Sequence, residues 1–312
     1  MARARTTAAV LALIGICLPA CSGSGGDSGD RPVTVAGDAA TCPGDLVDVV
    51  VSVSQWADMA HELGGDCATV TTVLASSAVD PHDFEPKPGD IAAFEDADLV
   101  VLNGAGYDTW AADAVRNLDP EPTVVSAADI AGSEDGDNPH LWYEPALLPR
   151  MAEALTEALT AASPDDGDVF TAQAEAWQQD LQPYVDQLAA LRTTAAGRTY
   201  AATETVFDLT AHAVGLEDVT PEGYRRAVSN EGDPAPGDIA AFESALTDGE
   251  VDLLVFNTQT EGQLPDQLRG AAEDAGVPVV EVTESPEDAA GSFVAWQVSQ
   301  LSALADALDG NP

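Results

Sequence analysis

An eight-residue segment that occurs twice constrains the fold of this chain more than any other feature. Residues 88–95 read Pro-Gly-Asp-Ile-Ala-Ala-Phe-Glu, and the same eight residues recur at 236–243. Each copy leads into an apolar run that ends in asparagine, at 98–103 and 252–257. Eight identical residues in order are improbable by chance. The repeat therefore predicts two related lobes, each with an equivalent helix–strand unit whose helix is capped by the aspartate of the repeat.

Strand-like and helix-like segments alternate along both halves of the chain. Apolar runs that predict strands lie at 49–53, 69–74, 99–103, 123–125, 199–202, 251–257 and 277–282. Predicted helices lie at 56–63, 89–96, 107–117, 205–214, 238–246, 264–275 and 292–308. Val- and Leu-rich strands separated by helices are typical of parallel sheets covered on both faces. We therefore predict an α/β protein with lobes at 44–143 and 197–312.

The segment between the lobes, residues 144–196, is predicted to be a helical linker. A first apolar stripe repeats every four residues, at Leu147, Met151, Leu155 and Leu159. A second helix is predicted to run to about residue 193, with Pro183 as a kink inside it. A helix of roughly 25 residues reaches nearly 40 Å. Such a helix is long enough to run along both lobes.

The N-terminus has the features of a secretory signal. Arg3 and Arg5 precede an apolar run at 8–18 that is too short to span a bilayer stably. Cys21 follows small residues, as in the lipobox of bacterial lipoproteins. We predict a signal peptide at 1–20, a lipid on Cys21 and a flexible Gly/Ser-rich tether at 21–43, which would hold the protein on the extracytoplasmic face of the cell membrane. Plain secretion with an unmodified Cys21 is the alternative.

Two further cysteines, Cys42 and Cys67, remain once Cys17 has left with the signal peptide. In an oxidising compartment two remaining cysteines usually pair. Each precedes an apolar run, so neighbouring strands would bring them together. We predict a disulfide, with two free buried thiols as the alternative.

The chain is strongly acidic. It has 11 Lys and Arg residues against 54 Asp and Glu residues, which gives a formal charge of −43. Such a field repels nucleic acid and anionic lipid and favours nearby cations. Nucleic acid is therefore excluded as a partner, whereas solubility explains most of the charge and the support for a cation ligand is weak.

Two of the four histidines directly follow a proline near a predicted strand end. His82 lies among three prolines at 79–90, and His140 lies in Asn-Pro-His-Leu-Trp at 138–142. Crevices in parallel α/β sheets lie at the carboxyl ends of the strands, so both imidazoles are expected to face one cleft. Glu204, which ends the first strand of the second lobe, would face the same cleft. Two imidazoles and a carboxylate suit a divalent transition metal.

Simpler interpretations of these residues stay open. A Pro-His turn is often an ordinary surface loop, and Glu204 could be a helix-start carboxylate favoured by the helix dipole. The other two histidines, His61 and His212, have no ligand neighbour at helical spacing. We predict that both lie on helix surfaces.

Several segments in order resemble the zinc- and manganese-binding solute-binding lipoproteins of bacterial ABC importers, the cluster A-I or ZnuA/TroA-like family. The specific elements are Pro-His-x-x-Glu-Pro at 81–86 and Asn-Pro-His-x-Trp at 138–142. The resemblance covers residues 44–308. It implies that His82 and His140 are the first two metal ligands and Glu204 the third, which is His in many zinc members and Glu in manganese members.

The position of the fourth ligand departs from the family pattern. Residues 283–285, Thr-Glu-Ser, resemble a Thr-Asp-Ser stretch of the family, but the later Gly-Asp-Ser segment is Ala-Gly-Ser here, so Gly291 replaces the expected aspartate. Glu284, Asp288 or a water could fill the position, and we predict Glu284. Asn257 and Gln259 lie at a strand end near the cleft. We expect them to donate hydrogen bonds to the metal-binding side chains without contacting the metal themselves.

The sequence thus predicts a monomeric solute-binding lipoprotein. It would capture one divalent transition metal, Zn²⁺ or Mn²⁺, between its lobes and deliver it to the permease and ATPase of an ABC importer. A secreted metallohydrolase with the same site is an alternative, because a catalytic metal needs an open position. The chain has no His-Glu-x-x-His or Gly-x-Ser-x-Gly motif, so we predict that it is not an enzyme. A surface adhesin is the third possibility.

Overall fold

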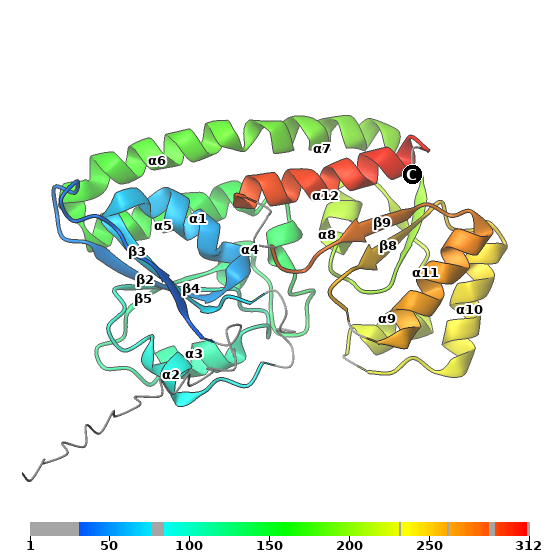
Figure 1. Ribbon diagram of the computed structural model, residues 1–312, viewed down its shortest axis with the longest axis horizontal. Helices are drawn as coiled ribbons and strands as arrows, with labels where there is room; N and C mark the ends of the chain where they lie inside the picture. The colour runs from blue at the N-terminus through cyan, green and yellow to red at the C-terminus, as the bar shows by residue number, and fades with distance from the viewer. Residues whose placement is uncertain (1–30, 77–83, 231, 261, 287–290, 311–312) are drawn as a thin grey trace, which may run out of the picture.

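The computed structural model describes residues 31–76, 84–230, 232–260, 262–286 and 291–310. It contains two sheets, each covered by helices, and a layer of long helices that runs over both (Figure 1). The predicted α/β architecture with two lobes is confirmed. A search of the described residues found no helix with the length and apolar character needed to cross a membrane.

The first lobe is built on a five-stranded sheet with the order β1-β3-β2-β4-β5. Its strands are β1 (Val33–Val35), β2 (Val47–Val53), β3 (Ala68–Leu74), β4 (Leu99–Leu102) and β5 (Thr123–Ser126). The last four run parallel, whereas β1 runs antiparallel to β3 at the outer edge. Part of the predicted tether is thus a strand, because its Val-Thr-Val triplet has the β-branched side chains that favour strand pairing.

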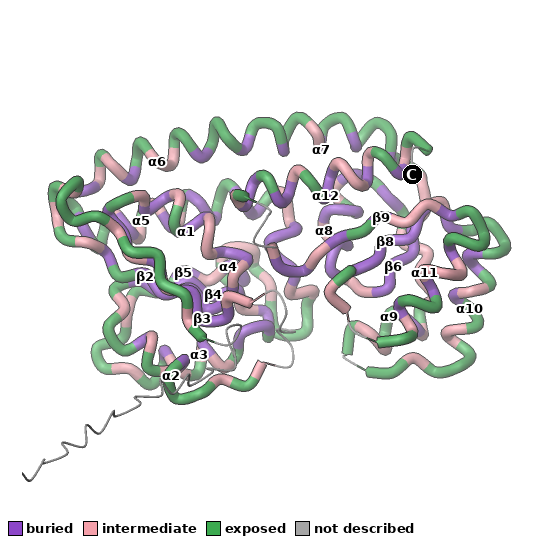
Figure 2. The backbone as a smooth tube through the Cα atoms, viewed as in Figure 1, coloured by how far each residue is buried: buried purple, intermediate pink, exposed green. Residues whose placement is uncertain are grey.

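Helices cover both faces of this sheet. They are α1 (Ala57–Gly64), α2 (Pro88–Ala92), α3 (Thr109–Val115), α4 (Ala127–Ala131) and α5 (Leu148–Ala162). Single turns of 3₁₀ helix lie at η1 (Ser54–Trp56), η2 (Gly65–Cys67), η4 (Leu141–Tyr143) and η5 (Pro164–Asp166). Buried residues follow the strands and the inner faces of the helices (Figure 2).

The second lobe has a four-stranded parallel sheet with the order β7-β6-β8-β9. Its strands are β6 (Thr199–Ala202), β7 (Glu217–Asp218), β8 (Leu253–Asn257) and β9 (Val279–Val282). Its helices are α8 (Asp208–Val214), α9 (Glu222–Val228), α10 (Pro236–Thr247), α11 (Gln263–Ala275) and α12 (Phe293–Leu308). Helix α9 was not predicted because it buries little: Tyr224 is its one fully buried residue.

The repeated segment forms α2 in the first lobe and the start of α10 in the second. The prediction that its aspartates cap these helices is wrong. Both helices begin at the proline of the repeat, so Asp90 and Asp238 occupy the third helical position. Asp90 still satisfies a helix-end donor, because its carboxylate accepts a hydrogen bond from the backbone amide of Lys87 at 2.7 Å.

The predicted long helix is two helices, α6 (Gly167–Asp180) and α7 (Gln182–Thr194), which meet at Leu181. Pro183 lies in the first turn of α7. A proline has no amide proton, and its ring clashes with the carbonyl four residues earlier, so the helix is interrupted at the predicted kink. Helix α6 packs on α1 of the first lobe, whereas α7 packs on α8 and α12 of the second (Figure 1).

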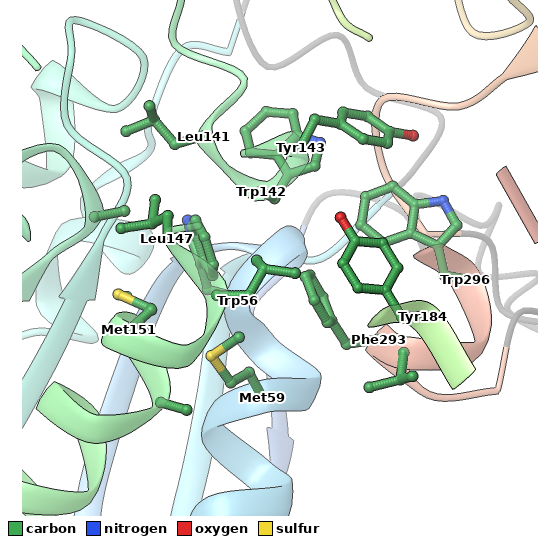
Figure 3. Close-up of a cluster of buried hydrophobic side chains, with 14 of the residues drawn as sticks. Trp56, Met59, Leu141, Trp142, Tyr143, Leu147, Met151, Tyr184, Phe293 and Trp296 are labelled. Carbon is green, nitrogen blue, oxygen red and sulfur yellow. The ribbon is translucent and has the colours of Figure 1, made fainter. Parts of the chain in front are cut away.

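Aromatic side chains fill the junction between the lobes (Figure 3). Phe293, the first residue of α12, stacks on Trp56 with the ring centroids 6.2 Å apart. Trp296, one turn later, contacts Tyr143 at 5.7 Å between centroids. All four rings are buried. Because close-packed aromatic contacts resist sliding, this junction favours small movements of one lobe against the other.

A carboxyl group at the packing of α1 against α6 gives a prediction for pH-dependent stability. Partial burial, together with the charges of Asp58 and Asp180, raises the pKa of Glu62 to about 7. A carboxyl whose pKa is raised in the folded state stabilises the fold at low pH. That contribution is lost as the pH rises through about 7.

Replacing Glu62 with Gln should therefore raise the free energy of unfolding at about pH 8 by about 1 kcal/mol, after allowance for solvent screening. At about pH 5 the variant and the parent should unfold at nearly the same urea concentration. Glu157→Gln, at an exposed site on α5, removes the same charge and serves as the control. If both variants gained the same unfolding free energy at about pH 8, the effect would come from the change in net charge and not from the burial of Glu62.

Candidate metal site

His140 stands in the first lobe, directly before η4 in the connection between α4 and α5, and is 4% exposed. The side chain of Asn138 accepts a hydrogen bond from the His140 backbone amide at 3.0 Å, which closes a local turn of the kind asparagine favours. The same Asn138 oxygen lies 2.7 Å from His140 Nδ1. Nδ1 therefore carries the proton, and Nε2 is the nitrogen that can bind a metal.

Glu284 approaches that nitrogen from the second lobe. It follows β9 by two residues and is 6% exposed, and its Oε1 lies 3.7 Å from His140 Nε2. The hydroxyl of Tyr107 donates a hydrogen bond to the same Oε1 at 2.7 Å. The Gln55 amide donates to the Glu284 carbonyl oxygen at 3.2 Å. Two residues of the first lobe thus hold Glu284 of the second lobe in place, Tyr107 through the carboxylate and Gln55 through the backbone.

The turn before Tyr107 explains how this side chain reaches the site. Gly104, Ala105 and Gly106 all have positive φ, which two glycines allow at little cost. The buried carboxylate of Asp108 fixes the turn, because it accepts hydrogen bonds from the amides of Asn103 at 2.7 Å and Gly104 at 2.8 Å. Burial raises the pKa of Asp108.

Glu204 follows β6 of the second lobe and is half-buried. Its Oε2 accepts a hydrogen bond from the Asn257 side chain at 2.7 Å. Burial raises the pKa of Glu204 above its ordinary value. The charge of Glu284 adds to the rise and that of His140 opposes it. Glu204 is therefore near enough to Glu284 and His140 for their charges to act on its carboxylate.

The repeated strand ends in an asparagine in each lobe, and each asparagine supports one side of the site. Asn257 holds Glu204, as described above. Asn103 is fully buried, donates to the carbonyl of Pro139 at 2.8 Å and accepts from the Trp56 indole at 3.1 Å. Pro139 directly precedes His140. The asparagine of the duplicated unit thus holds the backbone next to His140 in one lobe and the Glu204 carboxylate in the other.

Replacing Asn257 with Ala should weaken metal binding by about 10–100-fold, because Glu204 would lose the donor that orients it. Asn117→Ala, at an exposed site after α3, should leave the affinity unchanged. Competition with a chromophoric chelator would measure both affinities. Equal affinities in the two variants would show that Asn257 does not position the carboxylate.

Of the predicted ligands, His140 and Glu284 lie next to each other, with His140 Nε2 3.7 Å from Glu284 Oε1, and Glu204 stands two residues after β6 in a hydrogen bond with Asn257. His82 and Asp288 lie outside the described residues, as does Cys21. Gly291 is exposed near the start of α12. Gln259 holds the residue after Glu284, since its amide oxygen accepts a hydrogen bond from the Ser285 amide at 2.7 Å.

Other predictions are settled by the fold. Cys42 and Cys67 form the predicted disulfide. His61 and His212 are exposed on α1 and α8, as predicted. Gln55, Asn103 and Tyr107 were not predicted to support the site. Only Asn103 carried a signal, because it ends the first copy of the repeated unit.

The donor types on the described residues fit a divalent transition metal. His140 Nε2 lies 3.7 Å from the Glu284 carboxylate, and hydrogen bonds orient these two side chains and that of Glu204. Nitrogen and oxygen donors in this combination suit Zn²⁺ and Mn²⁺. Two lobes joined by long helices, with an imidazole of one lobe facing a carboxylate of the other, are typical of a two-lobed binding protein.

The chain belongs to the family described as zinc-uptake complex component A, periplasmic (ZnuA), whose model matches residues 49–307. It is 28% identical over 242 residues to the manganese-binding lipoprotein MntA of Halalkalibacterium halodurans, covering 76% of this chain and 78% of that protein. It is 22% identical over 274 residues to the zinc-binding lipoprotein AdcA of Streptococcus pneumoniae, covering 81% of this chain but only 54% of AdcA.

The fold is similar to that of the solute-binding protein FpvC of Pseudomonas aeruginosa, solved in complex with Mn²⁺. The TM-score is 0.71 at 19% identity, over 86% of this chain and all of FpvC.

Proposed function

We propose that this protein captures one divalent transition metal between its lobes and delivers it to the permease and ATPase of an ABC importer. The contact of His140 with Glu284 carries this proposal, because the imidazole belongs to the first lobe and the carboxylate to the second. A metal bound by both would join the lobes. Membership of the ZnuA family and the metal-binding names of the relatives support it.

The proposed ligands are His82, His140, Glu204 and Glu284. Two imidazoles and two carboxylates suit Mn²⁺ and also four-coordinate Zn²⁺. Zinc is expected to bind more tightly in direct competition, whichever metal is the biological cargo. The metal transported in the cell must therefore be identified from uptake rather than from affinity alone.

We further propose that the mature chain is a monomer anchored by a lipid on Cys21 to the extracytoplasmic face of the cell membrane. The basic and apolar N-terminal sequence before Cys21 supports the export step. The names of the two curated relatives, both lipoproteins, support the anchor.

A binding protein is favoured over a metallohydrolase for a structural reason. A catalytic zinc keeps one coordination position open for water. Here Glu284 lies next to the metal-facing nitrogen of His140, where it would occupy a position that a hydrolase needs. A surface adhesin is less favoured, because adhesion does not require buried His and Glu side chains that hydrogen bonds hold in place.

Elemental analysis of the protein purified from its own host tests the proposal, together with metal uptake by a strain that lacks it. We expect one equivalent of Zn or Mn per chain, and loss of uptake of that same metal in the deletion strain. Hydrolytic activity of the loaded protein with normal metal uptake in the deletion strain would refute it.

A further inference from the structure

Strand β1 determines the end of the first lobe from which the N-terminal segment leaves. Its first residue, Val33, pairs with Thr72 near the carboxyl end of β3, and Val35 pairs with Val70. The chain therefore enters the lobe at the carboxyl ends of the parallel strands. Helices α2 and α3 lie at this end of the lobe, and α6 lies at the opposite end, where it contacts η2 before β3 (Figure 1).

The path from β1 onward is fixed along β3. The amide of Asp38 donates to the carbonyl of Asp66 at 2.8 Å, and the disulfide joins Cys42 to Cys67 directly before β3. Gly37 has no room for a side chain, because a Cβ atom there would lie 2.4 Å from the Asp66 carbonyl oxygen. The N-terminal segment cannot shift its exit to the α6 end without breaking these contacts.

The distance from Cys21 to β1 is limited by chain length. Twelve residue steps separate Cys21 from Val33, and they span at most about 43 Å when fully extended. A lobe of about 100 residues has a radius of gyration of about 13 Å, which corresponds to a thickness of roughly 34 Å. If the α6 end faced the membrane, the segment would have to run nearly extended along the whole lobe. With the α2–α3 end facing the membrane, it needs no such extension.

We propose that the anchored protein presents the α2–α3 end of its first lobe to the lipid surface. This inference rests on the lipid anchor of the proposed function. Attraction between charges does not produce the orientation, because a chain with a formal charge of −43 is repelled by anionic lipid. The short tether and the position of β1 produce it. Glu204 and Glu284 follow β6 and β9 at their carboxyl ends, and the residue before His140 is bonded to Asn103 at the carboxyl end of β4. The end that carries the proposed metal site therefore faces the membrane in which a permease lies.

Position-dependent quenching in vesicles tests the orientation. Full-length lipidated protein is reconstituted in phosphatidylcholine vesicles that contain a lipid with a nitroxide on its headgroup. A fluorophore is attached at Gly89→Cys on α2 or at Ala176→Cys on α6; both sites are exposed, and a Cβ atom at Gly89 meets nothing within 4 Å. Cys42 and Cys67 do not react because they are paired.

We expect quenching at position 89 to be about twofold or more stronger than at position 176, because the tether restricts the lobe to one orientation. Inserting about 20 Gly and Ser residues between Gly26 and Asp27 should make the two sites nearly equal, since the longer segment can pass round the lobe. Equal quenching in the parent length, or stronger quenching at position 176, would overturn the orientation.

Flotation of the vesicles separates this inference from the function on which it rests. Protein that floats with the vesicles but shows no difference between the sites refutes the orientation and leaves the anchor intact. Protein that does not float refutes the anchor and the orientation together. Metal binding by a Cys21→Ser chain, which has no lipid, tests metal capture independently of both.

Discussion

Replacing His140 with Ala is expected to abolish the stabilisation that Zn²⁺ or Mn²⁺ gives to the folded protein. A ligand that binds only the native state raises its stability by RT ln(1 + [L]/Kd), so a loss of affinity appears as a loss of the metal-induced rise in melting temperature. His140 provides the nitrogen donor that faces Glu284 at 3.7 Å. Removing it should weaken metal binding by more than roughly 10–100-fold, which is the loss typical of removing a residue that only hydrogen-bonds a metal ligand.

The comparison is made within each variant, with and without metal, so that any effect on the fold itself cancels. His212→Ala is the matched control, because His212 is an exposed imidazole on α8. It should retain the full metal-induced shift. A shift of the same size in the His140 and His212 variants would show that the metal binds elsewhere.

Replacing Cys42 and Cys67 with Ser should lower the free energy of unfolding by about 3.5 kcal/mol. The cysteines are 25 residues apart in sequence, and closing a loop of this length restricts the unfolded chain by about that amount in the chain-entropy treatment. Urea unfolding of both proteins under oxidising conditions measures the difference. The affinity for metal should stay the same, because the disulfide lies at the amino end of β3, whereas Glu204, Glu284 and His140 lie at the carboxyl ends of the sheets.

A reducing agent provides the internal control for this second prediction. It should lower the unfolding free energy of the parent protein to that of the double variant and leave the variant unchanged. A parent protein that shows no such change on reduction would contradict the assigned contribution of the disulfide.

Part of the candidate site could be predicted from the sequence. His140 was selected as a residue beyond a strand end and Glu284 from its place in the Thr-Glu-Ser stretch, and these two side chains lie 3.7 Å apart. Tyr107 and Gln55 could not be found in this way. They meet Glu284 across 177 and 229 residues of sequence, and only the docking of one lobe on the other decides that contact.

The same distinction applies to the N-terminal segment. Residues 33–35 lie in a Gly- and Asp-rich region that predicts a tether, yet they pair with β3. A three-residue strand has too few side chains to give a periodic pattern, and its stability comes from the partner strand.

The sequence by itself determined the two lobes, the α/β class and the type of ligand, because these follow from local periodicity, from an exact repeat and from the chemistry of individual side chains. The tertiary structure alone decided which carboxylate lies beside His140, which residues of the first lobe hold it, and at which end of the lobe the chain begins. The physical reason is that these features depend on contacts between segments far apart in sequence. Their geometry is set by how whole elements pack, which no short stretch of residues encodes.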